Sequence, residues 1–234
     1  MNTERKIATI TGVLFIIATA ASLTGSGLTG SIFGATDYLS RIAGNGARVI
    51  IGALLTFLAA AGSAGIAIAL YPVLKKQNEG LALGAVGFRL IEAVFYMVGA
   101  LCLLCLFTVS QQFVNVGGQG ASTLQAMGHL LLTTHDLAGF VFGVLAFCLG
   151  GLMYYFIFYQ AKLVPRWLSV WGIISLVLLF AAVLLTLFDG EPFSISGNLI
   201  FLALPIFLQE IVLALWLIGK GFNPSASSAK VGMN

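Results

Sequence analysis

Long, unbroken apolar stretches dominate this sequence and restrict it to one class of fold. The run from Leu81 to Val109, for example, exceeds the ~20 residues that an α-helix needs to cross a ~30 Å hydrocarbon core. Apolar residues make up 59% of the chain and charged residues 8%, whereas soluble domains carry about a quarter charged residues. The runs also lack the alternation of a membrane β-barrel strand. The sequence therefore predicts an all-α, polytopic membrane protein.

The apolar stretches predict one transmembrane domain, a six-helix bundle within residues 1–222. The expected spans cover residues 7–26, 49–70, 81–109, 135–159, 167–188 and 199–218. Residues 28–47 are expected to form a polar loop, and residues 110–134 the longest connection, with a short interfacial helix over residues 122–132. The remaining residues, 223–234, are rich in Ser, Ala and Gly and are predicted to form a disordered cytoplasmic tail.

The charges of the connections predict how the helices cross the membrane. One side collects most of the basic residues, namely Arg5, Lys6, Lys75, Lys76, Lys162, Arg166, Lys220 and Lys230. The other side has Arg41 and Arg48 together with the acids Asp37, Asp189 and Glu191. Because basic loops stay inside, both termini are expected in the cytoplasm, and an even number of spans requires them to share a side. The basic residues form no stripe, so a nucleic-acid partner is not expected.

Aromatic residues near the expected span ends fit the belt that such residues form at membrane interfaces. Tyr71, Tyr154, Tyr159 and Trp167 occupy such positions. We therefore expect these four side chains to lie at the level of the lipid headgroups.

Three charged residues interrupt the apolar spans. Arg89 and Glu92 are one helical turn apart, so they can pair on one face of span three, and Tyr96 extends that face by another turn. Glu210 lies in span six. At 1.5 Å per residue, each of these charges lies roughly 12–17 Å from the cytoplasmic end of its span. Because a lone charge in hydrocarbon costs several kcal/mol, we expect spans three and six to lie side by side so that the charges neutralise one another.

The balance of these charges is uneven. Arg89 supplies one positive charge, whereas Glu92 and Glu210 supply two negative ones. If the three groups meet, either one carboxyl is protonated or a further cation completes the site. Arg89, Glu92, Glu210 and Tyr96 are therefore the candidate binding residues.

A second group of polar residues is expected toward the outer face. Arg48 opens span two, His135 and Asp136 open span four, and His129 precedes them in the long connection. This outer polar group could form a gate above the deeper site. Alternatively, its members are ordinary interfacial residues, with Asp136 capping the start of a helix. None of these spacings indicates a metal site, and none identifies a cofactor.

Small residues in span four predict close packing of helices. Gly139, Gly143, Ala146 and Gly150 recur at helical spacing and would let a second helix approach closely. We interpret this row as packing within the chain. The alternative is an interface between two copies in a homo-oligomer.

Several short motifs together resemble one family of bacterial membrane proteins. They are residues 71–76 (YPVLKK), 87–92 (GFRLIE), 135–136 (HD), 163–168 (LVPRWL) and 204–205 (LP) with Glu210. The family is known as domain of unknown function 4386, and the resemblance extends from the first span to Phe222. It implies a multi-pass protein of the bacterial inner membrane, and it implies no activity.

The leading hypothesis for function is a membrane module that binds a small molecule, lipid headgroup or ion, or transports it, at the level of the buried charges. Arg89 would be an anion-binding or structural group, and Glu92 and Glu210 would bind protons or cations. One alternative is an intramembrane enzyme acting on a lipid or quinone, with His135 and Asp136 as its acid–base pair. Another is a structural or signalling subunit in which the polar cluster only sets helix register.

Overall fold

The computed structural model describes residues 3–33, 35–116, 120–189 and 200–223 of the chain, and all its regular elements there are helices. Six helical segments are long and apolar enough to cross a membrane, which confirms the all-α, six-span prediction. They are α1 (Thr3–Phe33), α3 (Gly46–Leu74), α4 (Glu79–Val116), a continuous segment of α5 (Ala121–Asp136), η1 (Leu137–Gly143) and α6 (Val144–Ala161), then α7 (Arg166–Asp189) and α8 (Ile200–Gly219). Helix α2 (Tyr38–Gly44) is short. Most of the predicted tail, residues 224–234, lies outside the described residues.

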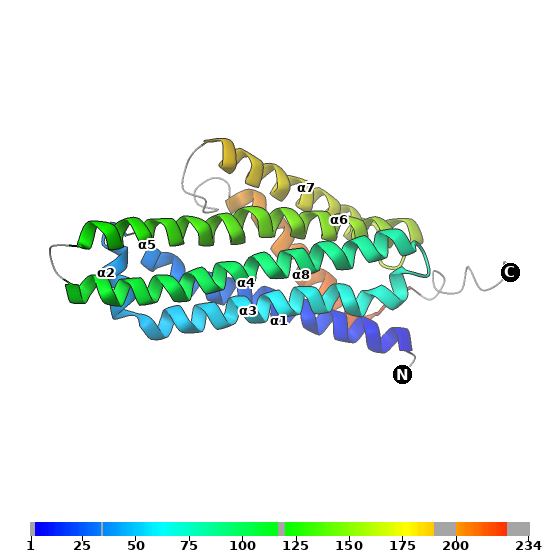
Figure 1. Ribbon diagram of the computed structural model, residues 1–234. Helices are drawn as coiled ribbons and strands as arrows, with labels where there is room; N and C mark the ends of the chain where they lie inside the picture. Colours follow the sequence, from blue (N-terminus) through cyan, green and yellow to red (C-terminus); the bar gives the residue numbers. More distant parts are fainter. Residues whose placement is uncertain (1–2, 34, 117–119, 190–199, 224–234) are drawn as a thin grey trace.

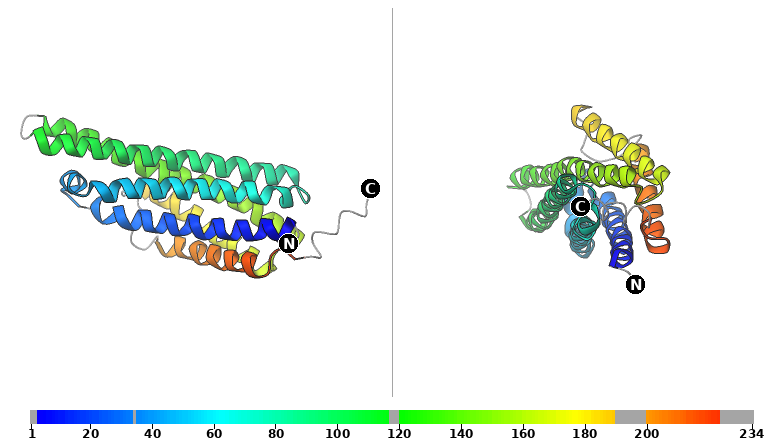
Figure 2. Two further views of the ribbon diagram at one scale, coloured as in Figure 1. Left: turned by 90° about the horizontal axis from the view of Figure 1, so that it is seen from below. Right: turned by 90° about the vertical axis from the view of Figure 1, so that its right-hand side faces the viewer.

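The six spans form a ring. Helix α1 packs against α3, α3 against α4, α4 against α6, α6 against α7, α7 against α8, and α8 returns to α1. Figure 1 shows the spans running along one long axis, and the end-on view in Figure 2 shows their order. In this order α4 and α8 occupy opposite places. The expectation that spans three and six lie side by side is therefore wrong. These two helices face each other across the ring and have other helices as neighbours.

The helices are longer than the sequence predicted. Helix α1 continues to Phe33, α4 continues to Val116, and the predicted connection over residues 110–134 is largely helical. The expected interfacial helix over residues 122–132 belongs to the continuous segment α5–η1–α6. At 1.5 Å per residue, α4 is ~57 Å long, which exceeds a ~30 Å hydrocarbon core.

Apart from the main core between the spans, a smaller apolar core explains why these extensions are helical. It joins the end of α1, helix α2, the start of α3 and the second half of α4, and its buried members are Ile32, Leu39, Ile42, Val49, Ala53, Ala100, Leu103 and Leu106. Leu131 and Leu132 of α5 pack against it. The polar residues of these segments therefore occupy one side of amphipathic helices. Averaging polarity along the segment hides the apolar side, so the segments looked like loops. We call this end of the bundle the α5 end.

The opposite end of the bundle carries the start of α1, the end of α8 and many of the basic residues, and we call it the basic end (Figure 1). Arg5 donates hydrogen bonds to the carbonyl oxygens of Leu217 and Gly219, at 3.2 and 2.9 Å. Lys76 pairs with Glu4 at 3.0 Å. These contacts attach the start of α1 to the end of α8 and to the α3–α4 turn. The grouping agrees with the charge asymmetry of the sequence.

The row of small residues predicted in span four packs within the chain. A methyl group added at Gly150 would lie 3.2 Å from Cγ of Arg89, and one at Gly143 would lie 3.0 Å from the ring of Tyr96. Both neighbours belong to α4. The row therefore lets α4 approach the η1–α6 segment, as expected for close helix packing.

Glycine also sets the distance between α1 and α8. A methyl group added at Gly12 would lie 2.7 Å from the carbonyl oxygen of Ala214, and that backbone atom cannot rotate away. Gly27, on the same helix, has no neighbour within 4 Å of the corresponding position. The two glycines thus form a matched pair, one at a contact and one facing outward.

Replacing Gly12 with Ala should lower the stability of the protein by about 1–3 kcal/mol, because the added methyl group overpacks the α1–α8 contact. Replacing Gly27 with Ala should leave stability unchanged or raise it by up to ~1 kcal/mol, since alanine favours helix. Thermal unfolding in detergent would measure both. Equal midpoints for the two variants would contradict the packing of α1 on α8.

Candidate functional site

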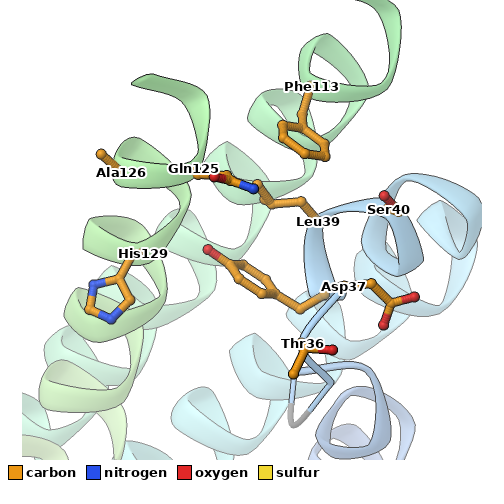
Figure 3. Close-up of a pocket in the computed structure, with 9 residues that line it drawn as sticks. Thr36, Asp37, Leu39, Ser40, Phe113, Gln125, Ala126 and His129 are labelled. Atoms are coloured by element: carbon orange, nitrogen blue, oxygen red, sulfur yellow. The ribbon is translucent and has the colours of Figure 1, made fainter. Parts of the chain in front are cut away.

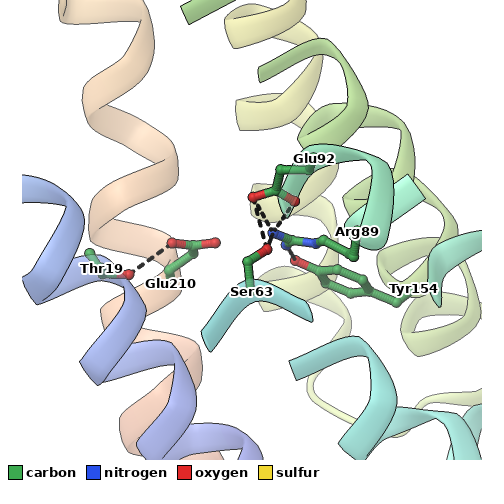
Figure 4. A network of polar contacts seen from close by, with 6 residues as sticks. All are labelled: Thr19, Ser63, Arg89, Glu92, Tyr154 and Glu210. Atoms are coloured by element: carbon green, nitrogen blue, oxygen red, sulfur yellow. Dashed lines mark hydrogen bonds and ion pairs between the residues drawn. The ribbon is translucent and has the colours of Figure 1, made fainter. Parts of the chain in front are cut away.

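The ring of helices encloses a buried ion pair on α4. Arg89 is 1% exposed and Glu92 is 2% exposed. The Arg89 Nη1 atom lies 3.1 Å from Glu92 Oε2, at the i, i+3 spacing that the sequence predicted. Figure 4 shows both side chains turned toward the inside of the bundle. The pair brings the local charge to zero, which removes most of the cost of placing either group in hydrocarbon.

Neighbouring helices complete the surroundings of this pair. Ser63 of α3 accepts a hydrogen bond from Arg89 Nη1 at 2.8 Å and donates one to Glu92 Oε1 at 2.8 Å. Tyr154 of α6 accepts a hydrogen bond from Arg89 Nη2 at 2.6 Å. The Phe147 ring lies 4.3 Å from the guanidinium carbon, close enough for a cation–π interaction. Arg89 is therefore held by side chains from α3, α4 and α6.

Glu210 enters the same space from the opposite side of the ring. It is 7% exposed, and the Thr19 hydroxyl of α1 donates a hydrogen bond to its Oε2 at 3.0 Å. Its carboxylate is close enough to interact electrostatically with Arg89 and Glu92. No ion pair within 4.0 Å joins it to a cation among the described residues. Figure 4 shows it separated from the Arg89 pair, with Ser63 between them.

The predicted binding residues thus divide into two parts. Arg89 and Glu92 form a closed, neutral pair, whereas Glu210 carries a carboxyl group with one neutral donor. Helical rise predicted a common depth for the three groups, and they are close enough to interact electrostatically. Arg89 forms its ion pair with Glu92, and no ion pair within 4.0 Å joins it to Glu210, so mutual neutralisation of all three charges stays a prediction.

Tyr96 lies at the edge of this cluster. Its ring packs against the backbone of η1, and its hydroxyl is close enough to Glu92 and Arg89 to interact with them electrostatically. Within the described residues it makes no hydrogen bond to the ion pair. Tyr96 therefore borders the site on the side toward the α5 end.

Sequence reasoning missed several polar partners. Tyr154 was assigned to the membrane interface, but it is wholly buried beside Arg89, so that assignment is wrong. Ser63 and Thr19 carried no signal, because hydroxyl groups in a span can bond to their own helix at little cost. Gln209 is also buried, accepting a hydrogen bond from Tyr155 at 2.5 Å and donating one to the Leu168 carbonyl at 3.1 Å.

Among the described residues, no hydrogen bond joins Arg48 of the predicted outer polar group to His135 or Asp136. Arg48 donates to the Leu28 carbonyl oxygen of α1 at 2.9 Å. His135 and Asp136 instead pair with each other, Nδ1 to Oδ1, at 2.9 Å. Asp136 makes no capping hydrogen bond, because α5 continues directly into η1. The capping interpretation is therefore wrong, and His135 and Asp136 remain a separate, partly buried pair.

A surface depression of about 560 Å³ lies near the α5 end (Figure 3). Its lining comes from residues 36–40, Phe113, Gln125, Ala126 and His129. Partial burial raises the pKa of the Tyr38 phenol in this wall. Most of the lining side chains are exposed, and no group of three or more His, Cys, Asp or Glu residues that could hold a metal is found in the described part of the chain.

Replacing Arg89 with Ala should destabilise the protein by about 3–5 kcal/mol, because Glu92 would remain buried without its cation. The double variant Arg89→Met, Glu92→Met removes both charges at similar volume and should recover most of that loss. Thermal unfolding midpoints in detergent would compare them. A double variant no more stable than Arg89→Ala would show that the ion pair does not set this cost.

Comparison with known proteins connects the fold to a family. No curated protein and no solved structure matches the chain. A family model does match residues 10–221, which include all six spans in whole or in large part and every residue of the buried cluster. The chain therefore belongs to the family described as Domain of unknown function (DUF4386).

Proposed function

We propose that this protein is a membrane module that binds a proton or a small cation at Glu210. The observation that carries the proposal is the unequal treatment of the two acids. Glu92 has the guanidinium of Arg89, whereas the Thr19 hydroxyl is the only donor to Glu210 among the residues that the structure describes. A carboxylate without a cation is costly inside a membrane, so this position favours a protonated carboxyl or a bound positive ion.

The Arg89–Glu92 pair explains why Arg89 does not supply the positive charge for Glu210. Because the pair is neutral and both Nη atoms of Arg89 already donate to Glu92, Ser63 and Tyr154, it has little tendency to give Arg89 up to Glu210. The residual field of the pair acts on Glu210 only as a dipole. The positive charge that completes the site would therefore come from solution.

The packing around Glu210 favours a small ligand over a lipid headgroup or larger molecule. Thr19 lies on α1, which is held close to both of its neighbours in the ring. A methyl group at Gly12 would meet Ala214 of α8 at 2.7 Å, and one at Gly62 of α3 would meet Ala18 at 3.0 Å. A proton or a single ion fits between such helices without moving them.

The geometry gives less support to the alternative of an enzyme. His135 and Asp136 form a pair of the kind that acid–base chemistry uses. The pair lies beyond Tyr96 from the buried charges, and its aromatic neighbours Phe33 and Phe140 supply no nucleophile. Binding at Glu210 therefore remains the proposed function, and transport of the bound ion is its extension.

Reaction with dicyclohexylcarbodiimide would test this proposal, because this apolar reagent adds to protonated carboxyl groups within membranes. Glu210 should be labelled, Glu92 should not, and the labelling of Glu210 should decline as pH rises. Mass spectrometry of the digested protein would locate the adduct. If Glu210 binds Na⁺ in place of a proton, NaCl should protect it at constant pH while an equal concentration of choline chloride should not.

The matched variants are Glu210→Gln and Thr19→Val. The first should abolish the adduct, and the second should keep it, because the carboxyl group remains. Parent protein that stays unlabelled at Glu210 at every pH, with its fold intact, would refute binding at this position. Labelling confined to Glu92 would refute the assignment of the two acids.

We further propose that the basic end faces the cytoplasm of a bacterial cell and that the protein lies in the inner membrane. The cations on the α3–α4 turn and at the start of α1 support this orientation, because basic connections are retained inside. The acidic residue Asp37 lies at the α5 end, next to α2.

Fusions to alkaline phosphatase, which is active only after export, should report this orientation. A fusion after Lys76 should be inactive, and a fusion after Gly120 should be active, because a single span separates the two positions. Enzyme activity normalised to the amount of fusion protein gives the readout. The reverse pattern would place the basic end outside.

A further inference from the structure

The basic end of the bundle contains two kinds of cation. Arg5 and Lys76 are satisfied within the protein, by carbonyl oxygens of α8 and by a carboxylate of α1. Lys162 and Arg166, on the turn between α6 and α7, are exposed and form no ion pair with an acid among the described residues. Residues 160–168 also contain no acid. This turn, which we call the α6–α7 turn, therefore carries two positive charges that the described part of the protein does not balance.

Lys162 holds an unusual backbone conformation. It ends α6 with φ 53° and ψ 34°, and it is the one residue other than glycine with a positive φ in the described ranges. Glycine is usual at such a helix end, because a Cβ atom makes this conformation costly. Asn223 holds the turn in place, donating its backbone N–H to the Leu163 carbonyl at 2.9 Å and its side-chain amide to the Lys162 carbonyl at 2.7 Å. A lysine kept where glycine is favoured indicates a use for its side chain.

An aromatic ring fixes the second cation. The guanidinium carbon of Arg166 lies 5.3 Å from the centre of the Tyr159 ring, within the range of a cation–π interaction. A guanidinium held by a ring still has N–H groups along its edge, and these can donate to the oxygens of a phosphate. Tyr159 is 38% exposed, so this pair lies on the outer surface of the bundle.

Two tryptophans continue this surface along α7. Trp167 follows Arg166 directly, and its ring lies 6.3 Å from that of Trp171, with 27° between the planes. Trp167 is 55% exposed, and the apolar Val170 and Ile174 beyond it are exposed as well. Tryptophan favours the boundary between lipid headgroups and acyl chains. Figure 1 shows the α6–α7 turn at the basic end, where the spans leave the hydrocarbon.

We propose that the α6–α7 turn binds the headgroup of an anionic phospholipid, with Lys162 and Arg166 on the phosphate and Trp167 beside the first part of an acyl chain. The occupant is a lipid because the turn and the exposed side of α7 face the bilayer. Charge complementarity favours a lipid with a net negative charge over a zwitterionic one. This inference goes beyond the proposed function, since it involves no residue of the Glu210 site.

Lys6 and Lys75 provide a matched comparison at the same end of the bundle. Both are exposed, and Lys75 also lies over a tyrosine, 5.4 Å from the centre of the Tyr71 ring. If net charge alone attracted anionic lipid, these two lysines would contribute as much as Lys162 and Arg166. A built site at the turn predicts unequal contributions.

Quenching of tryptophan fluorescence by brominated lipid would test the site, because bromine quenches only indole rings close to it. Trp216→Phe leaves Trp167 and Trp171 as the tryptophans of the chain. This protein would be reconstituted into phosphatidylcholine vesicles that contain increasing amounts of dibrominated phosphatidylglycerol or, as the reference, dibrominated phosphatidylcholine. The anionic lipid should reach half-maximal quenching at about a threefold lower mole fraction than the reference.

Two double variants then locate the effect. Lys162→Gln with Arg166→Gln should bring the two quenching curves together, whereas Lys6→Gln with Lys75→Gln removes the same charge and should leave them apart. Identical curves in the parent, or equal losses in both double variants, would overturn the proposal. A large excess of water-soluble glycerol phosphate should not relieve the quenching. Relief would assign the turn to free phosphate esters and would also overturn the proposal.

Lys162→Gly separates a role in lipid binding from a structural one. Glycine adopts positive φ without strain, so the thermal unfolding midpoint of this variant should be unchanged or higher. Its preference for phosphatidylglycerol should nevertheless fall, because the cationic side chain is gone. An unchanged preference would refute the role of this lysine, whatever the midpoint.

Discussion

Neutralisation of Arg89 inside hydrocarbon is the constraint on which the rest of the bundle depends. The guanidinium takes its partners from its own helix and from two neighbours, through Glu92, Ser63 and Tyr154. Each partner must stay at one depth and one rotation for these bonds to persist. Because unsatisfied polar groups are costly where no water is present, the three helices cannot slide past one another independently. The ion pair therefore sets the register of half the ring, whatever else it does.

The same neutral pair leaves Glu210 as the unbalanced charge. An arginine shared equally between two acids would have made a purely structural triad. Here Arg89 Nη1 lies 3.1 Å from Glu92 Oε2, whereas Glu210 accepts a hydrogen bond from the Thr19 hydroxyl. The asymmetry follows from helix order, because Glu92 is on the arginine's own helix and Glu210 is on the helix opposite. Fold topology thus produces a fixed ion pair on one side and a lone carboxyl group on the other.

The sequence predicted the local part of this site and missed the long-range part, for a physical reason. The pairing of Arg89 with Glu92 depends on a separation of three residues, and the depth of Glu210 depends on helical rise, so both can be calculated from one helix. Whether two helices are adjacent or opposite depends on all six. Tyr154 was misplaced because its position near a span end is equally compatible with the interface and with a buried hydrogen bond. The extensions of α4 and α5 were missed because their apolar faces are buried only through contacts with other helices, namely the end of α1, α2 and the start of α3.

The two ends of the bundle differ in the side chains that enclose the buried charges. Toward the basic end, the aromatic rings of Tyr154, Tyr155 and Phe158 pack into a layer without exposed surface. Toward the α5 end, the helix facing Tyr96 contributes glycine and a π-helical backbone. The buried charges are thus enclosed by aromatic side chains toward the basic end and by glycine packed directly on the Tyr96 ring toward the α5 end.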